Sequence, residues 1–292
     1  MKLLNKNAII TGGNQGFGLA VAEAFMKEGA NVVISARNEE KLKEATAYLK
    51  RFQMRDNQLL SMKADIAKYK DNFALIDFAL EKFNSVDILV ANAGVYGPKG
   101  NIEDIDWDDW SDAIDINLKG TVLSCRSVIK AMKEQRHGKI IILSGGGATK
   151  PMPFLSAYAV SKAAIVRFSD TLAEEVSEYN IDVNSIAPGA LNTRLLDEVL
   201  NSGPEKVGEQ FYAQSLKQKE NGGAPLEKGA GLCVYLASEE SNGITGKLIS
   251  AIWDPWQKFE LYRSEMMQTD IYTLKRIVPD DRGLNWPLKE NI

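Results

Sequence analysis

Short runs of consecutive apolar residues alternate along the chain with longer stretches whose apolar residues recur at helical spacing. Such runs predict strands buried on both faces, because a strand with one wet face would alternate polar and apolar positions. Seven strands are predicted, over residues 8–10, 32–34, 59–62, 88–91, 140–143, 183–187 and 248–252. Helices are predicted over residues 19–27, 39–51, 72–83, 107–133, 157–179 and 227–238. This order predicts an α/β fold, a doubly wound parallel sheet with helices on both faces.

Two segments depart from this alternation. Residues 192–224 contain several glycines and many charged residues, which predicts a helical insertion that serves as a substrate lid. Residues 255–292 extend beyond what the sheet requires and are rich in aromatic and charged side chains. We therefore expect a single domain over residues 1–254, followed by a C-terminal tail that is not an independent domain. Trp253 and Trp256, where domain and tail meet, fit a substrate-pocket wall or a subunit contact, with ordinary packing as the competing interpretation.

Composition narrows the classes of function. The chain has 292 residues, 45% hydrophobic and 25% charged, with a net charge of −4, which disfavours nucleic-acid binding. His137, the single histidine, excludes a Ser-His-Asp triad, and Cys125 and Cys233 lack metal-ligand spacing, so no metal is expected. No apolar leader opens the sequence, and no run approaches the roughly 18 apolar residues of a spanning helix. We expect a cytoplasmic protein with no membrane partner.

A glycine-rich segment, Thr11-Gly12-Gly13-Asn14-Gln15-Gly16-Phe17-Gly18, follows the first predicted strand. Glycines permit a sharp turn and let backbone N–H groups approach a pyrophosphate closely. The helix that begins there directs its positive end at the same phosphate. The placement between strand and helix predicts nucleotide binding rather than a simple connection.

The second predicted strand is followed by Arg37. A carboxylate at this place would bind the adenosine ribose hydroxyls and repel a 2′-phosphate, whereas an arginine offers a bidentate donor to that phosphate. Arg37 therefore favours NADP(H), with NAD(H) as the alternative. The competing interpretation is a solvated arginine at a strand end.

Tyr158 and Lys162 are four residues apart on a predicted helix, so they share one face. A free tyrosine has a pKa of roughly 10, which is too high for proton transfer near neutrality. A neighbouring ammonium group is expected to lower that pKa and make the pair an acid or base.

Together these motifs resemble the short-chain dehydrogenase/reductase (SDR) family, from Thr11 to about Ile249. The resemblance implies a Rossmann fold in which Lys162 also grips the nicotinamide ribose and the Asn117 carbonyl holds a relay water. It implies a catalytic set of Tyr158, Lys162 and Asn117, to which we add Ser144 as a candidate. The cofactor-binding set that we expect is Gly12, Asn14, Gln15, Gly16, Phe17, Gly18, Arg37, Asp65, Ile66, Asn92, Ala93, Gly94, Tyr158, Lys162, Pro188, Gly189 and Thr193.

The sequence departs from the family pattern thirteen residues before Tyr158, where the family usually has a serine and this chain has Gly145. Three explanations are open. The glycines could let Ser144 turn toward the substrate, or backbone N–H groups of Gly145 to Gly147 could donate to the substrate oxygen. In the third, the site works without this donor or has lost activity. The second is favoured, since three glycines suggest close backbone approach.

The leading hypothesis is an NADP(H)-preferring oxidoreductase that transfers hydride between nicotinamide and a small-molecule carbonyl or alcohol substrate. Lys150 and the lid cations Arg194, Lys206, Lys217 and Lys219 suit an anionic or sugar-related substrate, although a solvated helix surface explains them as well. The alternative is a cofactor-binding sensor or scaffold without efficient turnover, which Gly145 favours. A nucleotide-sugar epimerase or dehydratase is disfavoured by the glycine spacing. The resemblance also implies a homodimer or homotetramer, packed through the helices at 107–133 and 157–179.

Overall fold

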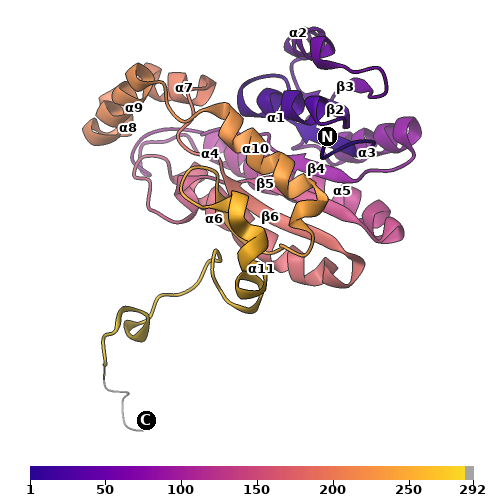
Figure 1. Ribbon diagram of the computed structural model, residues 1–292. Coiled ribbons are helices and arrows are strands. Elements are labelled where there is room, and N and C mark those ends of the chain that lie inside the picture. The colour runs from indigo at the N-terminus through magenta and orange to yellow at the C-terminus, as the bar shows by residue number, and fades with distance from the viewer. Residues whose placement is uncertain (287–292) are drawn as a thin grey trace.

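The computed structural model describes residues 1–286 and is built on a seven-stranded parallel sheet (Figure 1). The strand order is β3-β2-β1-β4-β5-β6-β7, and every neighbouring pair is parallel. The strands are β1 (Asn7–Thr11), β2 (Asn31–Ala36), β3 (Leu59–Lys63), β4 (Ile88–Ala91), β5 (Gly138–Leu143), β6 (Ile181–Ala187) and β7 (Lys247–Ser250). All seven predicted strands are confirmed, with ends that differ by a few residues.

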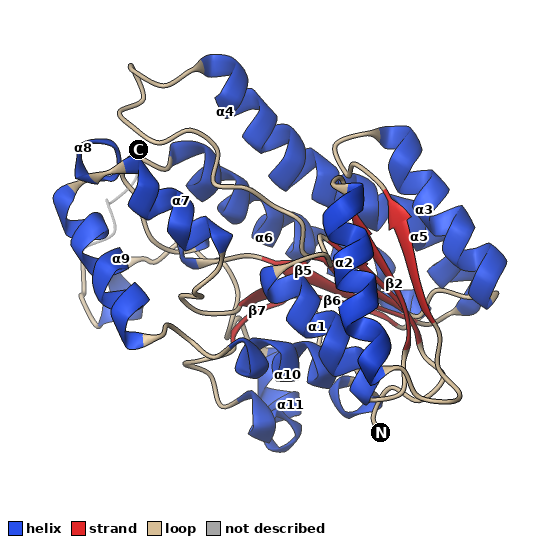
Figure 2. Cartoon of the chain, turned by 90° about the horizontal axis from the view of Figure 1, so that it is seen from above, coloured by secondary structure: helices blue, strands red, loops and turns tan. Residues whose placement is uncertain are grey.

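Helices cover both faces of the sheet, as the view from above shows (Figure 2). They are α1 (Gly16–Lys27), α2 (Glu39–Leu49), α3 (Tyr69–Phe83), α4 (Trp107–Ile114), α5 (Gly120–Gln135), α6 (Ser156–Val176), α7 (Arg194–Ser202), α8 (Pro204–Val207), α9 (Glu209–Asn221), α10 (Leu226–Ala237) and α11 (Phe259–Gln268). Within residues 1–286, no helix has the length and apolar character needed to cross a membrane.

Alternating strand residues supply the two layers of the core. Ile10 of β1 packs in the layer that contains α1 and α10, whereas its neighbour Ile9 packs in the layer that contains α3, α5 and α6. Both side chains are almost completely buried, and each such burial contributes about 1.5–3 kcal/mol. The uninterrupted apolar runs of the sequence follow from this two-sided burial.

The strand order reverses beside β1, which lies between β2 and β4. At such a switch point the connections leave in opposite directions, and a crevice opens at the carboxyl ends of the strands. The glycine-rich segment follows β1, and Asn92 follows β4, so both lie at this crevice. The topology thus places the predicted site motifs at one edge of the sheet.

The long helix predicted over 107–133 is wrong in one respect, because a π-helical turn divides it. This turn, Asp115–Lys119, separates α4 from α5 and contains Asn117. A π turn inserts an extra residue into the helical register, and such turns occur frequently at functional sites. Hydrophobic periodicity does not reveal an insertion of a single residue.

The start of the C-terminal segment is part of the core. Trp256, Phe259 and Met266 are buried in the layer of α1 and α10. The same segment covers the outer edge of β7, where the backbone N–H of Leu248 donates to the Tyr272 carbonyl at 2.7 Å. An occupied edge is protected against pairing with another strand. Removing everything after residue 254 would therefore expose both part of the core and the outer edge of β7 to solvent.

Candidate active site

The glycine-rich turn is held in a conformation that other residues would not adopt. Gly12 has a φ of +65°, and a Cβ added to Gly18 would lie 2.3 Å from the Gly12 carbonyl oxygen. Helix α1 begins at Gly16 without a side-chain cap and without an acidic residue in its first turn. Its free N–H groups and positive end fit an anionic group such as a pyrophosphate.

Asn92 links this turn to the end of β4. Its side-chain amide donates to the carbonyl oxygens of Thr11 and Gly12, at 2.9 and 3.1 Å. In return, the Thr11 hydroxyl accepts hydrogen bonds from the backbone N–H groups of Asn92 and Ala93, at 3.0 and 3.2 Å. These four bonds fix two neighbouring loops against each other and explain an asparagine at this position.

One large cavity, about 1130 Å³ in volume, runs along the carboxyl ends of the strands. Every residue of the predicted cofactor-binding set lines it: Gly12, Asn14, Gln15, Gly16, Phe17, Gly18, Arg37, Asp65, Ile66, Asn92, Ala93, Gly94, Tyr158, Lys162, Pro188, Gly189 and Thr193. The start of the lid also lies close to the glycine turn, since a Cβ on Gly16 would meet Thr193 at 3.4 Å. The fold therefore brings together residues that are up to 181 positions apart.

At the far end of the cavity, Arg37 follows β2 directly and is exposed. Asn38 caps α2 by accepting a hydrogen bond from the Lys41 backbone N–H at 2.9 Å. Arg37 forms no ion pair with any residue in the range 1–286. Glu39, the nearest carboxylate in the sequence, pairs instead with Lys43 and Lys63. The cavity end beside Arg37 is thus open to an additional anionic group.

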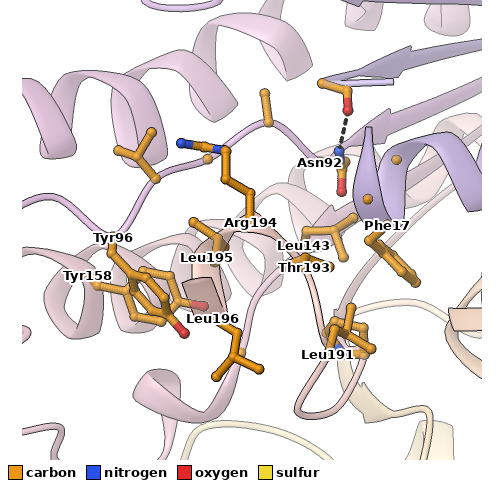
Figure 3. Close-up of a pocket in the computed structure, with 18 of the residues that line it drawn as sticks. Phe17, Asn92, Tyr96, Leu143, Tyr158, Leu191, Thr193, Arg194, Leu195 and Leu196 are labelled. Atoms are coloured by element: carbon orange, nitrogen blue, oxygen red, sulfur yellow. Dashed lines mark hydrogen bonds between the residues drawn. The ribbon is translucent and has the colours of Figure 1, made fainter. Parts of the chain in front are cut away.

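Tyr158, in the first turn of α6, lies against Tyr96 from the loop after β4. The two rings meet edge to face, with centroids 4.6 Å apart (Figure 3). Burial raises the pKa of the Tyr158 phenol well above its ordinary value, and Tyr96 adds to the effect. The pKa of Tyr96 is itself raised to about 12, again by burial first and by Glu198 second. Tyr158 therefore carries its proton at neutral pH.

Lys162 lies one helical turn further along α6 and is buried. Its Nζ donates to the Leu143 carbonyl at the end of β5, at 2.6 Å, and lies 5.5 Å from the centre of the Tyr158 ring. Burial lowers the pKa of this lysine to about 8. The expected lowering of the Tyr158 pKa by Lys162 is thus not found, because burial raises that pKa and the ammonium group is directed at the Leu143 carbonyl.

Asn117, in the π turn, is buried and anchors the loop after β4. Its side chain accepts from the Val95 backbone N–H and donates to the Val95 carbonyl, each at 2.8 Å. It also donates to the Ser161 hydroxyl of α6, at 3.1 Å. The Asn117 carbonyl accepts a hydrogen bond from the Thr121 hydroxyl at 2.8 Å.

Ser144 and Gly145 lie at the end of β5 with different orientations. The buried Ser144 hydroxyl donates to the Lys162 carbonyl at 3.3 Å, so it holds β5 against α6. A Cβ added to Gly145 would instead lie 2.8 Å from the Tyr158 hydroxyl oxygen. Position 145 is thus the one that faces the tyrosine, and the phenol already occupies the space that a side chain would need.

Sequence reasoning missed several residues around Tyr158. Tyr96 carried no motif, and only the close pair of rings identifies it. Lys99 of the same loop approaches Glu198 of α7 at 3.8 Å, and Glu198 also pairs with Arg194. These contacts connect α7, in the segment predicted to be a lid, to the loop after β4, and no local sequence signal marks them.

The sheet order, the glycine turn at the switch point and the Tyr158–Lys162 pair define a dinucleotide-binding oxidoreductase of the doubly wound class. Comparison with known proteins agrees with this class. Residues 6–202 match the family model of the short chain dehydrogenases, and the chain belongs to that family.

Curated relatives and solved structures cover most of the chain. Dehydrogenase/reductase SDR family member 4 of Sus scrofa is 34% identical over 85% of this chain and 86% of that protein. The protein of the same name in Caenorhabditis elegans is 33% identical over 84% of this chain and 92% of that protein. The structure of levodione reductase has a TM-score of 0.78 at 25% identity and covers 88% of this chain and 99% of that chain. The family and fold thus establish an oxidoreductase that binds NAD or NADP.

Proposed function

We propose that the chain is an NADP(H)-preferring enzyme that reduces the carbonyl group of a small molecule to an alcohol. The observation that carries this proposal is that Tyr158 and Lys162 line the same cavity as the glycine turn of α1. A proton donor and a dinucleotide cradle in one cavity are the two parts that carbonyl reduction requires.

The cofactor would lie along the carboxyl ends of the strands. The N–H groups at the start of α1 would hold its pyrophosphate, and Asp65 and Ile66 would flank its adenine. Pro188, Gly189 and Thr193 would border its nicotinamide end. The bound cofactor supplies the hydride that reaches the carbonyl carbon. Arg37 supports the preference for NADP(H), since it is unpaired in the described chain and suits a 2′-phosphate.

In this proposal Tyr158 donates a proton to the substrate oxygen. The phenol is protonated at neutral pH, which is the form that a proton donor needs, although the burial that raises its pKa also makes it a weaker acid. Lys162 bonds to the Leu143 carbonyl and orients the end of β5 beside Tyr158. Asn117 lies in the π turn, where the regular helical hydrogen-bond pattern is interrupted, and this supports the role of its carbonyl in holding a relay water.

A second donor to the substrate oxygen would come from the backbone of Gly145 to Gly147. The N–H groups of these three residues have no carbonyl acceptor within residues 1–286, whereas the Ser144 hydroxyl is bonded to Lys162. A donor of this kind contributes roughly a hundred- to a thousandfold in rate. The alternative function, a sensor or scaffold without efficient turnover, remains a prediction that Gly145 motivates. The homodimer or homotetramer and the cytoplasmic location likewise stay predictions.

The test is a fluorescence titration with NADPH and with NADH at one salt concentration, followed by NADPH oxidation with a panel of ketones. We expect tighter binding of NADPH, and we expect Arg37→Asp to abolish the preference. Arg55→Asp is the matched control, since it makes the same charge change at an exposed residue outside the cavity. Equal binding of both cofactors would refute the role of Arg37, and the absence of turnover with every ketone would favour the sensor.

A further inference from the structure

A second phenol hydroxyl lies next to the one that the proposed reaction uses. Tyr96 from the loop after β4 and Tyr158 of α6 both line the cavity. Their ring centroids are 4.6 Å apart with an interplanar angle of 61°, and in Figure 3 the two hydroxyl oxygens lie at the same end of the pair. The hydroxyl of Tyr96 is therefore placed beside the proton donor.

The Tyr96 hydroxyl is available to a bound ligand. It forms no hydrogen bond with any residue in the range 1–286, and its oxygen is not closed off from the cavity. Burial of the ring and the charge of Glu198 raise the pKa of Tyr96 to about 12, so the hydroxyl keeps its proton at neutral pH. A protonated phenol without a partner is a free hydrogen-bond donor.

The backbone on both sides of Tyr96 is fixed, which holds its side chain in a defined place. Asn117 accepts from the Val95 backbone N–H and donates to the Val95 carbonyl, each at 2.8 Å. Gly97 has a φ of +73°, and a Cβ added there would lie 2.6 Å from the Cβ of Ala113 in α4. Tyr96 thus lies between two anchored residues. A donor that needs no rearrangement is the kind that stabilises a developing charge most effectively.

Strand β5 leaves the place for such a donor without a side chain. The family usually has a serine at position 145, where this chain has glycine. The neighbouring Ser144 hydroxyl donates to the Lys162 carbonyl and is not directed at Tyr158. A second side-chain hydroxyl next to Tyr158 therefore comes from the loop after β4 and not from β5.

We infer that Tyr96 is a further catalytic residue, whose hydroxyl donates a hydrogen bond to the substrate oxygen and takes over the function of the serine that position 145 lacks. This inference rests on the proposed function, since it concerns the oxygen that Tyr158 protonates. As hydride adds to the carbonyl carbon, negative charge develops on that oxygen. Tyr158 transfers its proton to the oxygen, while Tyr96 keeps its own proton and only donates a hydrogen bond. An alkoxide has lone pairs for several donors, so the backbone N–H groups of Gly145 to Gly147 can act at the same time.

The first test is Tyr96→Phe, which removes the hydroxyl and keeps the ring against Tyr158. We expect kcat for ketone reduction with NADPH to fall about a hundredfold, because one donor to the developing oxyanion is lost. The KM of the ketone and the Kd of NADPH should stay within about threefold, since this hydrogen bond strengthens only as the charge develops.

Tyr235→Phe is the matched control. The Tyr235 hydroxyl also lacks a partner within residues 1–286, and its ring also packs near another aromatic ring, that of Trp256. This hydroxyl is buried in α10 and lies outside the cavity, so its removal should leave kcat unchanged.

Tyr96→Leu separates donation from positioning, because it removes the ring as well as the hydroxyl. If Tyr96 only positioned Tyr158, Tyr96→Phe would keep its activity and Tyr96→Leu alone would lose it. That result overturns the inference, and so does a loss of kcat below about threefold in Tyr96→Phe.

Binding of a stable oxyanion gives a readout that does not depend on turnover. The probes are 4-nitrophenolate and nitrobenzene, which are similar in shape, although only the first carries an oxyanion. Each is titrated by calorimetry into the complex of the enzyme with NADP+, at a pH at which the probe is ionised and the two tyrosines are not. Tyr96→Phe should weaken binding of 4-nitrophenolate about tenfold and that of nitrobenzene less than about twofold. Equal affinity of the variant and the unmodified enzyme for 4-nitrophenolate contradicts the inference.

These outcomes separate the inference from the proposed function. Failure of the unmodified enzyme to bind NADPH, or to reduce any ketone, rejects the reductase itself. Normal reduction by Tyr96→Phe rejects only the role of Tyr96.

Discussion

Replacing Gly145 with alanine tests whether the position of Tyr158 depends on the missing side chain. The added Cβ would lie 2.8 Å from the phenol oxygen, and ordinary contacts begin at 3.4 Å, so the hydroxyl must move by about 0.6 Å. The Tyr158 ring also packs against the Tyr96 ring, which limits how it can move. A misplacement of about 1 Å at a reacting group costs roughly a hundredfold in rate. We therefore expect kcat/KM for ketone reduction to fall about tenfold.

The assay is steady-state NADPH oxidation, with the Kd of NADPH measured in parallel. That Kd should stay within about twofold, because the nearest atoms to the added methyl group belong to Tyr158 and not to the glycine turn that would hold the pyrophosphate. Gly146→Ala is the matched comparison: a Cβ there would meet no atom within 4 Å, so its loss of rate measures only the reduced backbone freedom. Equal activity of Gly145→Ala and the unmodified enzyme would refute the reasoning.

Three further predictions concern the neighbouring groups. Lys162→Met should abolish turnover. It should also raise the free energy of unfolding by up to about 3 kcal/mol at pH 7, because burial lowers the pKa of Lys162 to about 8 and the charged lysine therefore destabilises the folded state. This gain should shrink as pH rises from 8 to 10, where the folded state already releases the proton, and urea unfolding at pH 7 and pH 9.5 checks it. Ser144→Ala should change kcat less than threefold while lowering the unfolding free energy by about 1 kcal/mol, and a hundredfold loss of kcat would instead identify Ser144 as a donor to the substrate. Asn92→Ala should weaken NADPH binding about tenfold in a fluorescence titration, since it leaves the carbonyls of Thr11 and Gly12 without their partner; an unchanged Kd would contradict the anchoring role.

Local signals in the sequence predicted most of the sheet and the cofactor side of the cavity. Strands buried on both faces must be apolar throughout, so their positions can be read from a single run of residues. The glycine turn and Arg37 follow directly after strands. Because parallel strands end at one edge of the sheet, a residue's place after a strand also predicts its place in the cavity.

Other features depend on contacts between distant segments. The π turn at Asn117 adds one residue to a helix whose periodicity looked continuous. Trp256 is 9% exposed and packs near Tyr235, whereas Trp253, three residues earlier, is 85% exposed. The sequence around the two tryptophans does not indicate which one is buried, and only the path of the chain after β7 distinguishes them.

The sequence by itself determined the doubly wound fold, the glycine turn before α1 and the Tyr158–Lys162 pair, because these depend on spacing within one element or just after a strand. The tertiary structure decided what surrounds the pair. It directed Ser144 at α6, placed the Tyr158 hydroxyl in the space beside Gly145 and raised the pKa of Tyr158 through burial against Tyr96. Desolvation and orientation depend on neighbours from other parts of the chain, so no local pattern of residues encodes them.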